Sequence, residues 1–242
     1  EPTIVVVPDA ILLDENDCYS LQAAMLQHCG YKLKNRFAIL DVYEGAKERT
    51  FDDDDAVDKF RNGVGSNFLQ WGASYYPFLN TTIVSKSEID FTRIANLDGL
   101  TEVLSKEVAQ NLEADNITAA RAEGITAEID KIAETTDADA VNSLNSTLTV
   151  ISPSLNLILA EISEMLNVLP PSPAMAGAYT MVDSQASVAQ SPANISLGSV
   201  IAPVVNINND NQEELNLPLN GKAVNAIRTF QGKGVLVWGA RT

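Results

Sequence analysis

Residues 4–42 read IVVVPDAILLDENDCYSLQAAMLQHCGYKLKNRFAILDV, and this stretch decides the fold class. Ile4–Val7 is an apolar, β-branched run that is closed by a turn signal, as is typical of a buried strand. Asp14 or Asn16 is placed to cap a helix, and we expect Gly30 to end it. Phe37–Val42 is the next buried strand. A strand, a helix and a second strand in succession predict a βαβ unit with a parallel sheet.

Further elements are expected on both sides of a change in composition. In the first part, a short helix follows the acids Asp52–Asp55, and a strand is expected near Thr82–Ser85. In the last part, Ala178–Val182 is a strand candidate and Ala223–Phe230 a short helix. Gly234–Gly239 is an apolar strand in which Trp238 is expected to be buried, because such runs have both sheet faces covered.

The middle of the chain has a different character. Residues 97–169 are rich in Ala, Leu, Glu and Asn, and their apolar positions follow helical spacing. One helix is expected to start at Ser152-Pro153, and turns are expected at Asp115-Asn116 and Thr135–Asp137. We therefore predict an α/β protein with a mixed β-sheet core flanked by helices, interrupted by a self-contained insertion of three or four helices. The expected division is 1–96 and 170–242 for the two parts of the core and 97–169 for the insertion.

Charge limits the classes of partner. The 242 residues carry a formal net charge of −16. Nucleic-acid binding needs a basic face that releases counterions from phosphates, so no nucleic-acid partner is expected. No run of 18 apolar residues is present, so no direct membrane insertion is expected either.

Residues that could carry chemistry are few and do not form known motifs. Cys18 and Cys29 lie eleven residues apart on one expected helix, about 16 Å along its axis, which is too far for a disulfide; we expect two buried thiols on one face, consistent with a reducing compartment. The single histidine, His28, lacks the neighbours of a zinc site or a catalytic triad. Asp52–Asp55 fails the EF-hand pattern and is interpreted as a helix-capping run.

Two Gly-Lys pairs, Gly221-Lys222 and Gly232-Lys233, lack the rest of a phosphate-binding loop. We therefore predict no catalytic, cofactor-binding or metal-binding residues, no cofactor, and no enzymatic activity.

Several segments resemble the contractile bacteriophage tail sheath family, which includes sheath subunits of extracellular contractile injection systems. The segment 71–79, WGASYYPFL, resembles that family's Gly-Ala-x-Tyr-Tyr-Pro-aromatic-Leu segment, and His28–Val42 resembles its helix ending in His-Cys before a strand. Pro170–Asp183 and Ser191–Thr242 resemble later segments, the last running through Asn-Ala-Ile-Arg to a final Trp-Gly-Ala-Arg-Thr. The resemblance covers roughly 1–85 and 170–242.

The sequence also departs from the family. Residues 184–190, SQASVAQ, lack the Arg, Gly and Trp that the family usually carries there, so the contacts of that loop in the family are not expected here. The chain starts at Glu1 and stops at Thr242, each beside an expected strand. We expect it to be a fragment without the family's N-terminal arm and helical C-terminal domain, and to be unable to form a sheath alone.

The resemblance implies a structural subunit that assembles with itself into hexameric rings around an inner tube and contracts to drive the tube through a target envelope. Neighbours would be linked by exchanged strands, and the inner tube protein and the baseplate would be further partners. The implied location is the bacterial cytoplasm during assembly and then a phage tail or tail-like particle. Two alternatives from other classes remain: an α/β enzyme with a pocket between sheet and insertion, and a binding module that contacts a partner through the helical insertion.

Overall fold

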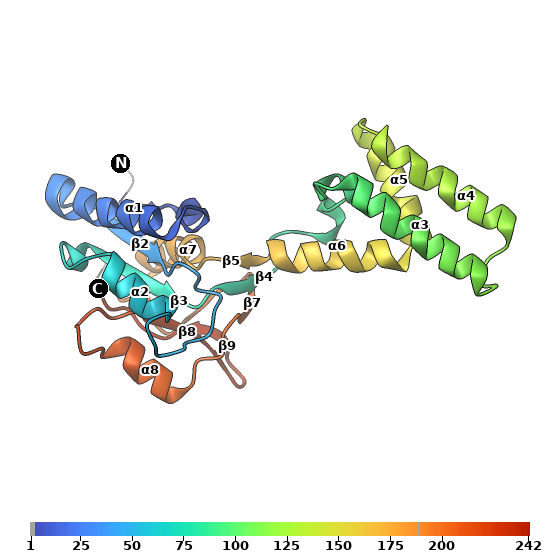
Figure 1. Cartoon of the computed structure of the whole chain (residues 1–242). Coiled ribbons are helices and arrows are strands. Elements are labelled where there is room, and N and C mark those ends of the chain that lie inside the picture. Colours follow the sequence, from blue (N-terminus) through green and yellow to red (C-terminus); the bar gives the residue numbers. More distant parts are fainter. Residues whose placement is uncertain (1–2, 188) are drawn as a thin grey trace. The chain divides into compact units, whose positions relative to one another are not determined.

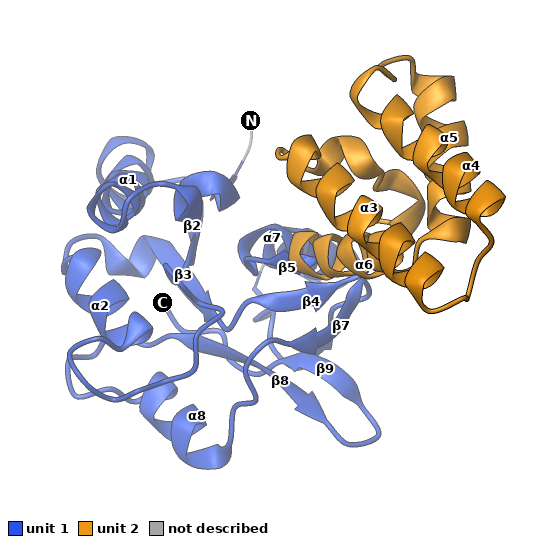
Figure 2. Ribbon diagram, turned by 45° about the vertical axis from the view of Figure 1, so that its right-hand side comes forward, with its two compact units in different colours: residues 1–82, 167–242 blue, residues 83–166 orange. Residues whose placement is uncertain are grey.

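The computed structural model describes residues 3–187 and 189–242, which form two compact units (Figure 1). Unit 1 comprises residues 1–82 and 167–242, and unit 2 comprises residues 83–166 (Figure 2). Glu1 and Pro2 of the opening segment, and Val188 of the variant segment 184–190, lie outside the described residues.

Unit 1 is built on a mixed sheet, as the sequence predicts. The order of its strands is β1-β2-β3-β8-β9-β6, parallel from β1 to β8 and antiparallel from β8 to β6. The parallel register places Ile4 beside Phe37, and Ala38 beside Gly72. The strands are β1 (Ile4–Val6), β2 (Phe37–Asp41), β3 (Gly72–Tyr76), β8 (Asn225–Phe230), β9 (Gly234–Val237) and β6 (Ile195–Ser196).

Helices cover both faces of this sheet. Leu40 of β2 packs with α1 (Glu15–Gln27) and α2 (Ala56–Gly63), whereas Ile39 packs on the other face with α7 (Ser172–Gln185). Neighbouring residues of a strand point to opposite faces, and both faces of β2 are apolar because both are covered. The helix α8 (Asn209–Asn216) adds Leu215 to the core on the α1 and α2 side.

A smaller sheet joins the two chain segments of unit 1. Its order is β5-β4-β7, all antiparallel, with β4 at Leu79–Thr81, β5 at Val168–Leu169 and β7 at Val200–Pro203. The backbone N–H of Thr81 donates to the carbonyl of Asn167, which holds together the two ends between which unit 2 is inserted.

Unit 2 is helical, which confirms the expected helical insertion. Its helices are α3 (Leu97–Glu113), α4 (Ala119–Ile129), α5 (Ala138–Ile151) and α6 (Pro153–Leu166). They enclose their own apolar core, which includes Leu104, Ile132, Leu148 and Leu155. Thr118 and Asp137 cap α4 and α5 with their side chains, and Pro153 opens α6 as the sequence indicates.

The limits of unit 2 differ from the expected 97–169. Ile89 and Phe91 belong to the apolar core of the helical unit, so the unit starts at Ile83. Val168 and Leu169 pair with β4, so they belong to unit 1. Helical periodicity alone misses the first of these segments because residues 83–96 contain only short 3-10 turns, at Lys86–Glu88 and Phe91–Arg93.

Two of the predicted elements in the last third of the chain are wrong. Ala178–Val182 is part of helix α7, not a strand, because Pro173 favours a helix start and Met175, Ala178 and Val182 form one buried helical face. Ala223–Phe230 is not a helix. Its residues from Asn225 form β8, which lies between β3 and β9.

Two boundaries in the first part also differ. Gly30 does not end the first helix, because the helical turn continues as a π-helix from His28 to Leu33 and stops at Lys34, which is left-handed (φ 53°). A Cβ atom on Gly30 would lie 2.6 Å from the Trp71 ring, so close packing explains this glycine. The strand expected near Thr82–Ser85 lies earlier, as β4.

Trp238 is not buried, contrary to expectation. The residue follows β9 directly and is 40% exposed, whereas Val235, Leu236 and Val237 are buried. Its ring lies 4.6 Å from that of Phe230 at an angle of 49°. The strand ends one residue too early to place this ring in the core.

Candidate functional site

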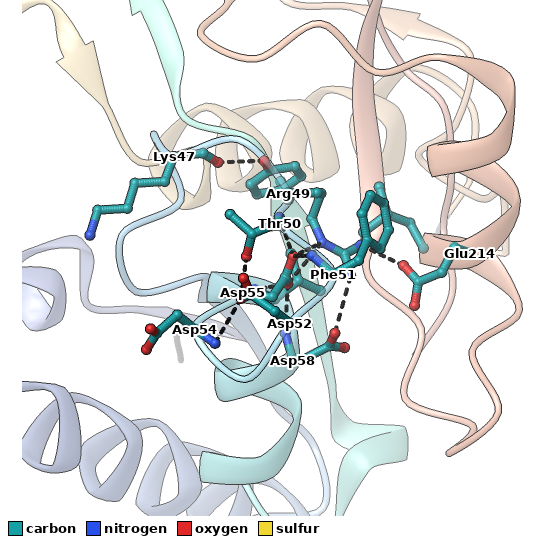
Figure 3. Close-up of polar contacts among 12 residues, drawn as sticks. Lys47, Arg49, Thr50, Phe51, Asp52, Asp54, Asp55, Asp58 and Glu214 are labelled. Atoms are coloured by element: carbon teal, nitrogen blue, oxygen red, sulfur yellow. Dashed lines mark hydrogen bonds and ion pairs between the residues drawn. The ribbon is translucent and has the colours of Figure 1, made fainter.

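A cluster of hydrogen bonds and ion pairs surrounds the acid run Asp52–Asp55 (Figure 3). Asp55 is fully buried and is the N-cap of α2, where its carboxylate accepts hydrogen bonds from the backbone N–H groups of Val57 and Asp58. This confirms the capping interpretation of the run. Asp52 turns back on its own loop, accepting from the Thr50 hydroxyl at 2.7 Å and from the Asp54 N–H at 2.9 Å.

Arg49 neutralises the buried carboxylate of Asp55. Its Nε lies 2.8 Å from Oδ1 and 2.7 Å from Oδ2, and both side chains are at most 1% exposed. The N–H groups of Thr50 and Phe51 donate to the same carboxylate, and the Arg49 guanidinium stacks on the Phe51 ring at 4.6 Å. A buried charge needs such a set of partners, because an unpaired one is strongly destabilising.

Glu214, from α8, joins this pair to a second buried arginine. Its carboxylate accepts from Arg49 Nη1 at 2.5 Å and also from Arg61 Nη1. Arg61, on α2, is itself 1% exposed and also contacts Asp58 at 3.0 Å. Its Nε donates to the backbone carbonyl of Lys222 at 3.0 Å. We call Arg49, Asp55, Asp58, Arg61 and Glu214 the ionic cluster.

Protonation equilibria follow from this geometry. Burial by itself raises the pKa of Asp55, but the hydrogen bonds from Arg49 and the backbone outweigh it and hold the pKa below its usual value. The pKa of Glu214 is also lowered, because hydrogen bonds from Arg49 and Arg61 outweigh its desolvation. Both carboxylates are therefore charged at neutral pH, which is the state that their arginine partners need.

The ionic cluster is suited to holding segments together. It ties the loop 43–55, α2 and α8 into one body, although Arg49 and Glu214 are 165 residues apart in sequence. Among the described residues, no group of three or more His, Cys, Asp or Glu side chains is placed to hold a metal ion. The contacts of Arg49 and Arg61 with Asp55 and Glu214 make the ionic cluster a structural clamp between these segments.

Of the other residues singled out from the sequence, the cysteines and His28 lie apart from this cluster, whereas Lys222 contacts Arg61. Cys18 and Cys29 are buried free thiols, and burial raises the pKa of both, that of Cys18 to about 11. His28 Nε2 lies 3.4 Å from Arg36 Nη1. Lys222 is used inside the fold, because its ammonium donates to the carbonyl of Arg61 at 2.5 Å.

Unit 1 contains a small cavity on the α1 and α2 side of the sheet. Its volume is about 70 Å³, and its lining includes Leu26, Leu40, Phe60, Ser74 and Lys222. Sites for small-molecule ligands usually measure about 300–1,000 Å³. This cavity is smaller than that range, and no histidine, aspartate or glutamate side chain is among the described residues that line it.

A second buried carboxylate escaped the sequence analysis. Asp41, at the end of β2, is 2% exposed and accepts from the N–H and the hydroxyl of Ser172 at the start of α7, at 2.8 and 2.5 Å. Burial raises its pKa to about 7, although the bonds from Ser172 oppose the shift. It fastens α7 to the sheet. The sequence places Asp41 inside the expected buried strand Phe37–Val42, but it does not show which residue pairs with its carboxylate.

The sheets of unit 1 end in strands with one open edge. Among the described residues, β1 pairs only with β2 and β6 only with β9, and β5 and β7 border the smaller sheet. An open edge presents unpaired N–H and C=O groups, to which another strand can add. No helix of the described residues is long and apolar enough to cross a membrane.

Comparison with known proteins gives matches in solved structures alone. No family profile matches the chain, and neither does any curated protein. One similar structure is the baseplate of the anti-feeding prophage, with 20% identity and a TM-score of 0.45 over 95% of this chain. Another is the helical sheath of the anti-feeding prophage in its contracted state, with 21% identity and a TM-score of 0.42 over 94% of this chain. The chain spans about a third, 35%, of each matched chain.

Proposed function

We propose that this chain is a structural subunit of a contractile tail sheath. In this proposal it assembles with itself into hexameric rings around an inner tube and contracts to drive the tube through a target envelope. The observation that carries the proposal is the agreement between the sheath-like motifs and the fold. The motifs fall in two blocks, roughly 1–85 and 170–242, and unit 1 is made of nearly the same two blocks, 1–82 and 167–242.

The motifs also form neighbouring elements of unit 1. Residues 71–79 form β3 and lead into β4, Pro170–Asp183 contains most of α7, and the last segment forms β8 and β9. Segments that resemble one family and pack together as one core support a common structural ancestor better than scattered matches do. The segment without such resemblance is largely the separate helical unit.

A contractile role needs stable subunits and adaptable links between them. The ionic cluster and the Asp41–Ser172 contact make unit 1 a firmly tied body. The open edges of β1, β6, β5 and β7 offer places for exchanged strands. Contraction without nucleotide hydrolysis would draw on an assembled state that rearranges between rigid subunits. The inner tube protein and the baseplate are the further partners in this proposal, within a phage tail or tail-like particle.

Electron microscopy of the purified complete protein tests the proposal. Rings or tubes with six subunits per turn are the expected result. Particles without regular assembly, over a concentration series that reaches the millimolar range, would count against it.

A second candidate function is a binding module formed by unit 2. Val150, Leu157 and Met165 are 84, 68 and 72% exposed, and a binding module would use exposed apolar side chains of this kind in its contact. Replacement of all three by serine should leave the helical content unchanged and weaken binding of that partner. Unchanged assembly of the particle would favour the sheath role over this one.

A further inference from the structure

A cationic segment stands out in this acidic chain. Residues Tyr31–Arg36 read YKLKNR and contain Lys32, Lys34 and Arg36. No acid occurs between Asp17 and Asp41, although the chain has 32 acidic and 16 basic residues. We call Tyr31–Arg36 the cationic end. Residues 31–35 are exposed, and neither lysine pairs with a carboxylate among the described residues.

The fold adds a second acid-free stretch to the cationic end. The Tyr31 ring, on a residue that is 67% exposed, lies 6.3 Å from the Phe68 ring, and Gly30 packs directly against Phe68 and Trp71. Residues 62–87 contain no acid. Neither of these two stretches brings a carboxylate to the cationic end, and the Tyr31 and Phe68 rings lie side by side at its base.

The opposite end of the same strand carries the densest acidic run. The cationic end leads directly into β2, and the loop 43–55 follows it. That loop packs at the carboxyl ends of the strands, because the Tyr76 hydroxyl donates to the Lys47 carbonyl at 2.6 Å and the Phe78 N–H donates to the Gly45 carbonyl at 2.9 Å. Asp52–Asp54, all exposed, form the acidic loop at this end.

We propose that copies of this chain join head to tail, with the cationic end of one copy seated on the acidic loop of the next. Charge complementarity selects a second copy as the occupant. With a net charge of −16, two copies repel each other in most orientations, and this orientation brings unlike charges together. A contact between two different surfaces repeats from copy to copy and generates rings or helical filaments. The inference rests on the proposed function and names a subunit contact for it.

Charge-swapped variants test the contact by sedimentation of the 242-residue chain up to about 1 mM in low salt, where exposed charges act over about 30 Å at 0.01 M. K32E/K34E gives a copy that is acidic at both ends, and D53K/D54K gives one that is basic at both. We expect each variant alone to associate at least tenfold more weakly than the wild type, and an equimolar mixture to regain association. In 1 M salt, where the screening length is about 3 Å, wild-type association should fall as well.

The matched control is K86E/R93E, which changes the net charge equally at two exposed residues of unit 2. It should associate like K32E/K34E if net charge alone decides, which would overturn the proposal. A mixture that fails to regain association although both variants keep their far-UV circular dichroism would also overturn it. So would a wild-type chain that does not associate at all, or a cationic end that binds a labelled single-stranded oligonucleotide and no second copy.

Imaging of the complete protein, taken together with these mixtures, separates this contact from the proposed function. Regular tubes of the complete protein, together with a mixture that fails to associate, would leave the sheath role standing and remove this contact. Association restored in the mixture, with a complete protein that forms no rings or tubes, would keep the contact and remove the sheath role.

Discussion

Replacement of Glu214 by glutamine is the sharpest perturbation of the ionic cluster. The substitution keeps the shape of the side chain and removes the charge that faces Arg49 and Arg61, which are both 1% exposed at their side chains. Loss of one partner from a fully buried ion pair costs about 3–5 kcal/mol. The Glu214 side chain is 33% exposed, so solvent screening reduces the expected loss to about 2–3 kcal/mol.

Thermal unfolding monitored by tryptophan fluorescence measures this loss of stability in unit 1. Both tryptophans, Trp71 and Trp238, lie in unit 1, so excitation at about 295 nm reports unit 1 alone. For a domain of about 150 residues each kcal/mol lowers Tm by about 2–4 °C. Glu214→Gln should therefore lower Tm by roughly 4–12 °C at pH 7.

Glu213→Gln is the matched control, because Glu213 is exposed on the same helix and forms no ion pair with the described residues. Its Tm should stay within about 1 °C of the wild type, since surface charges contribute little. Equal Tm values for the two variants would refute the clamp. The pKa values of Asp55 and Glu214 are lowered by folding, so the stability that they add is present above their unfolded pKa values and is lost as pH falls through the folded ones. The gap between wild type and Glu214→Gln should close in acid.

Substitutions of Trp238, of Asp41 and of two glycines test other parts of the molecule. Trp238→Ala should lower the free energy of unfolding by about 1–2 kcal/mol, as measured by chemical denaturation monitored by far-UV circular dichroism. This is well below the ~3–5 kcal/mol of a buried tryptophan, because the residue is half-exposed and its ring packs against Phe230. A loss above about 3 kcal/mol would restore the core assignment. Burial raises the pKa of Asp41 to about 7, so the free energy of unfolding of the wild type should fall as pH rises from about 4 to 7. In urea titrations at several pH values, Asp41→Asn should lack this fall. Parallel pH profiles of the two proteins would contradict the burial argument. Gly63→Ala should lower Tm, because the new Cβ would lie 2.1 Å from the ring of Tyr19 in α1. Gly124→Ala in α4 has open space around its Cβ and should stabilise unit 2 by about 0.5–1 kcal/mol. An unchanged Tm for Gly63→Ala would show that the Tyr19 ring moves aside.

Local signals explain what the sequence predicted correctly. Strands β1 and β2 follow from apolar runs next to turn signals, and the cap at Asp55 follows from an acid placed before a helix. The helices of unit 2 follow from apolar spacing that one face of each helix satisfies by itself. Each of these signals is complete within about fifteen residues.

The errors arise where distant residues decide the structure. Asn225–Phe230 becomes a strand because β3 and β9 flank it, and no local spacing records those neighbours. The ionic cluster joins Arg49 to Glu214 across 165 residues, and no motif in either segment announces the pair. Trp238 follows a buried strand by one residue, and only the end of that strand decides its exposure.

Assembly into a sheath can be seen directly by imaging the complete protein together with its inner tube. Cryo-electron microscopy should show six subunits per ring around the tube, with the α/β unit forming the continuous wall. A monodisperse complete protein that leaves the tube bare at every concentration would contradict assembly into a sheath.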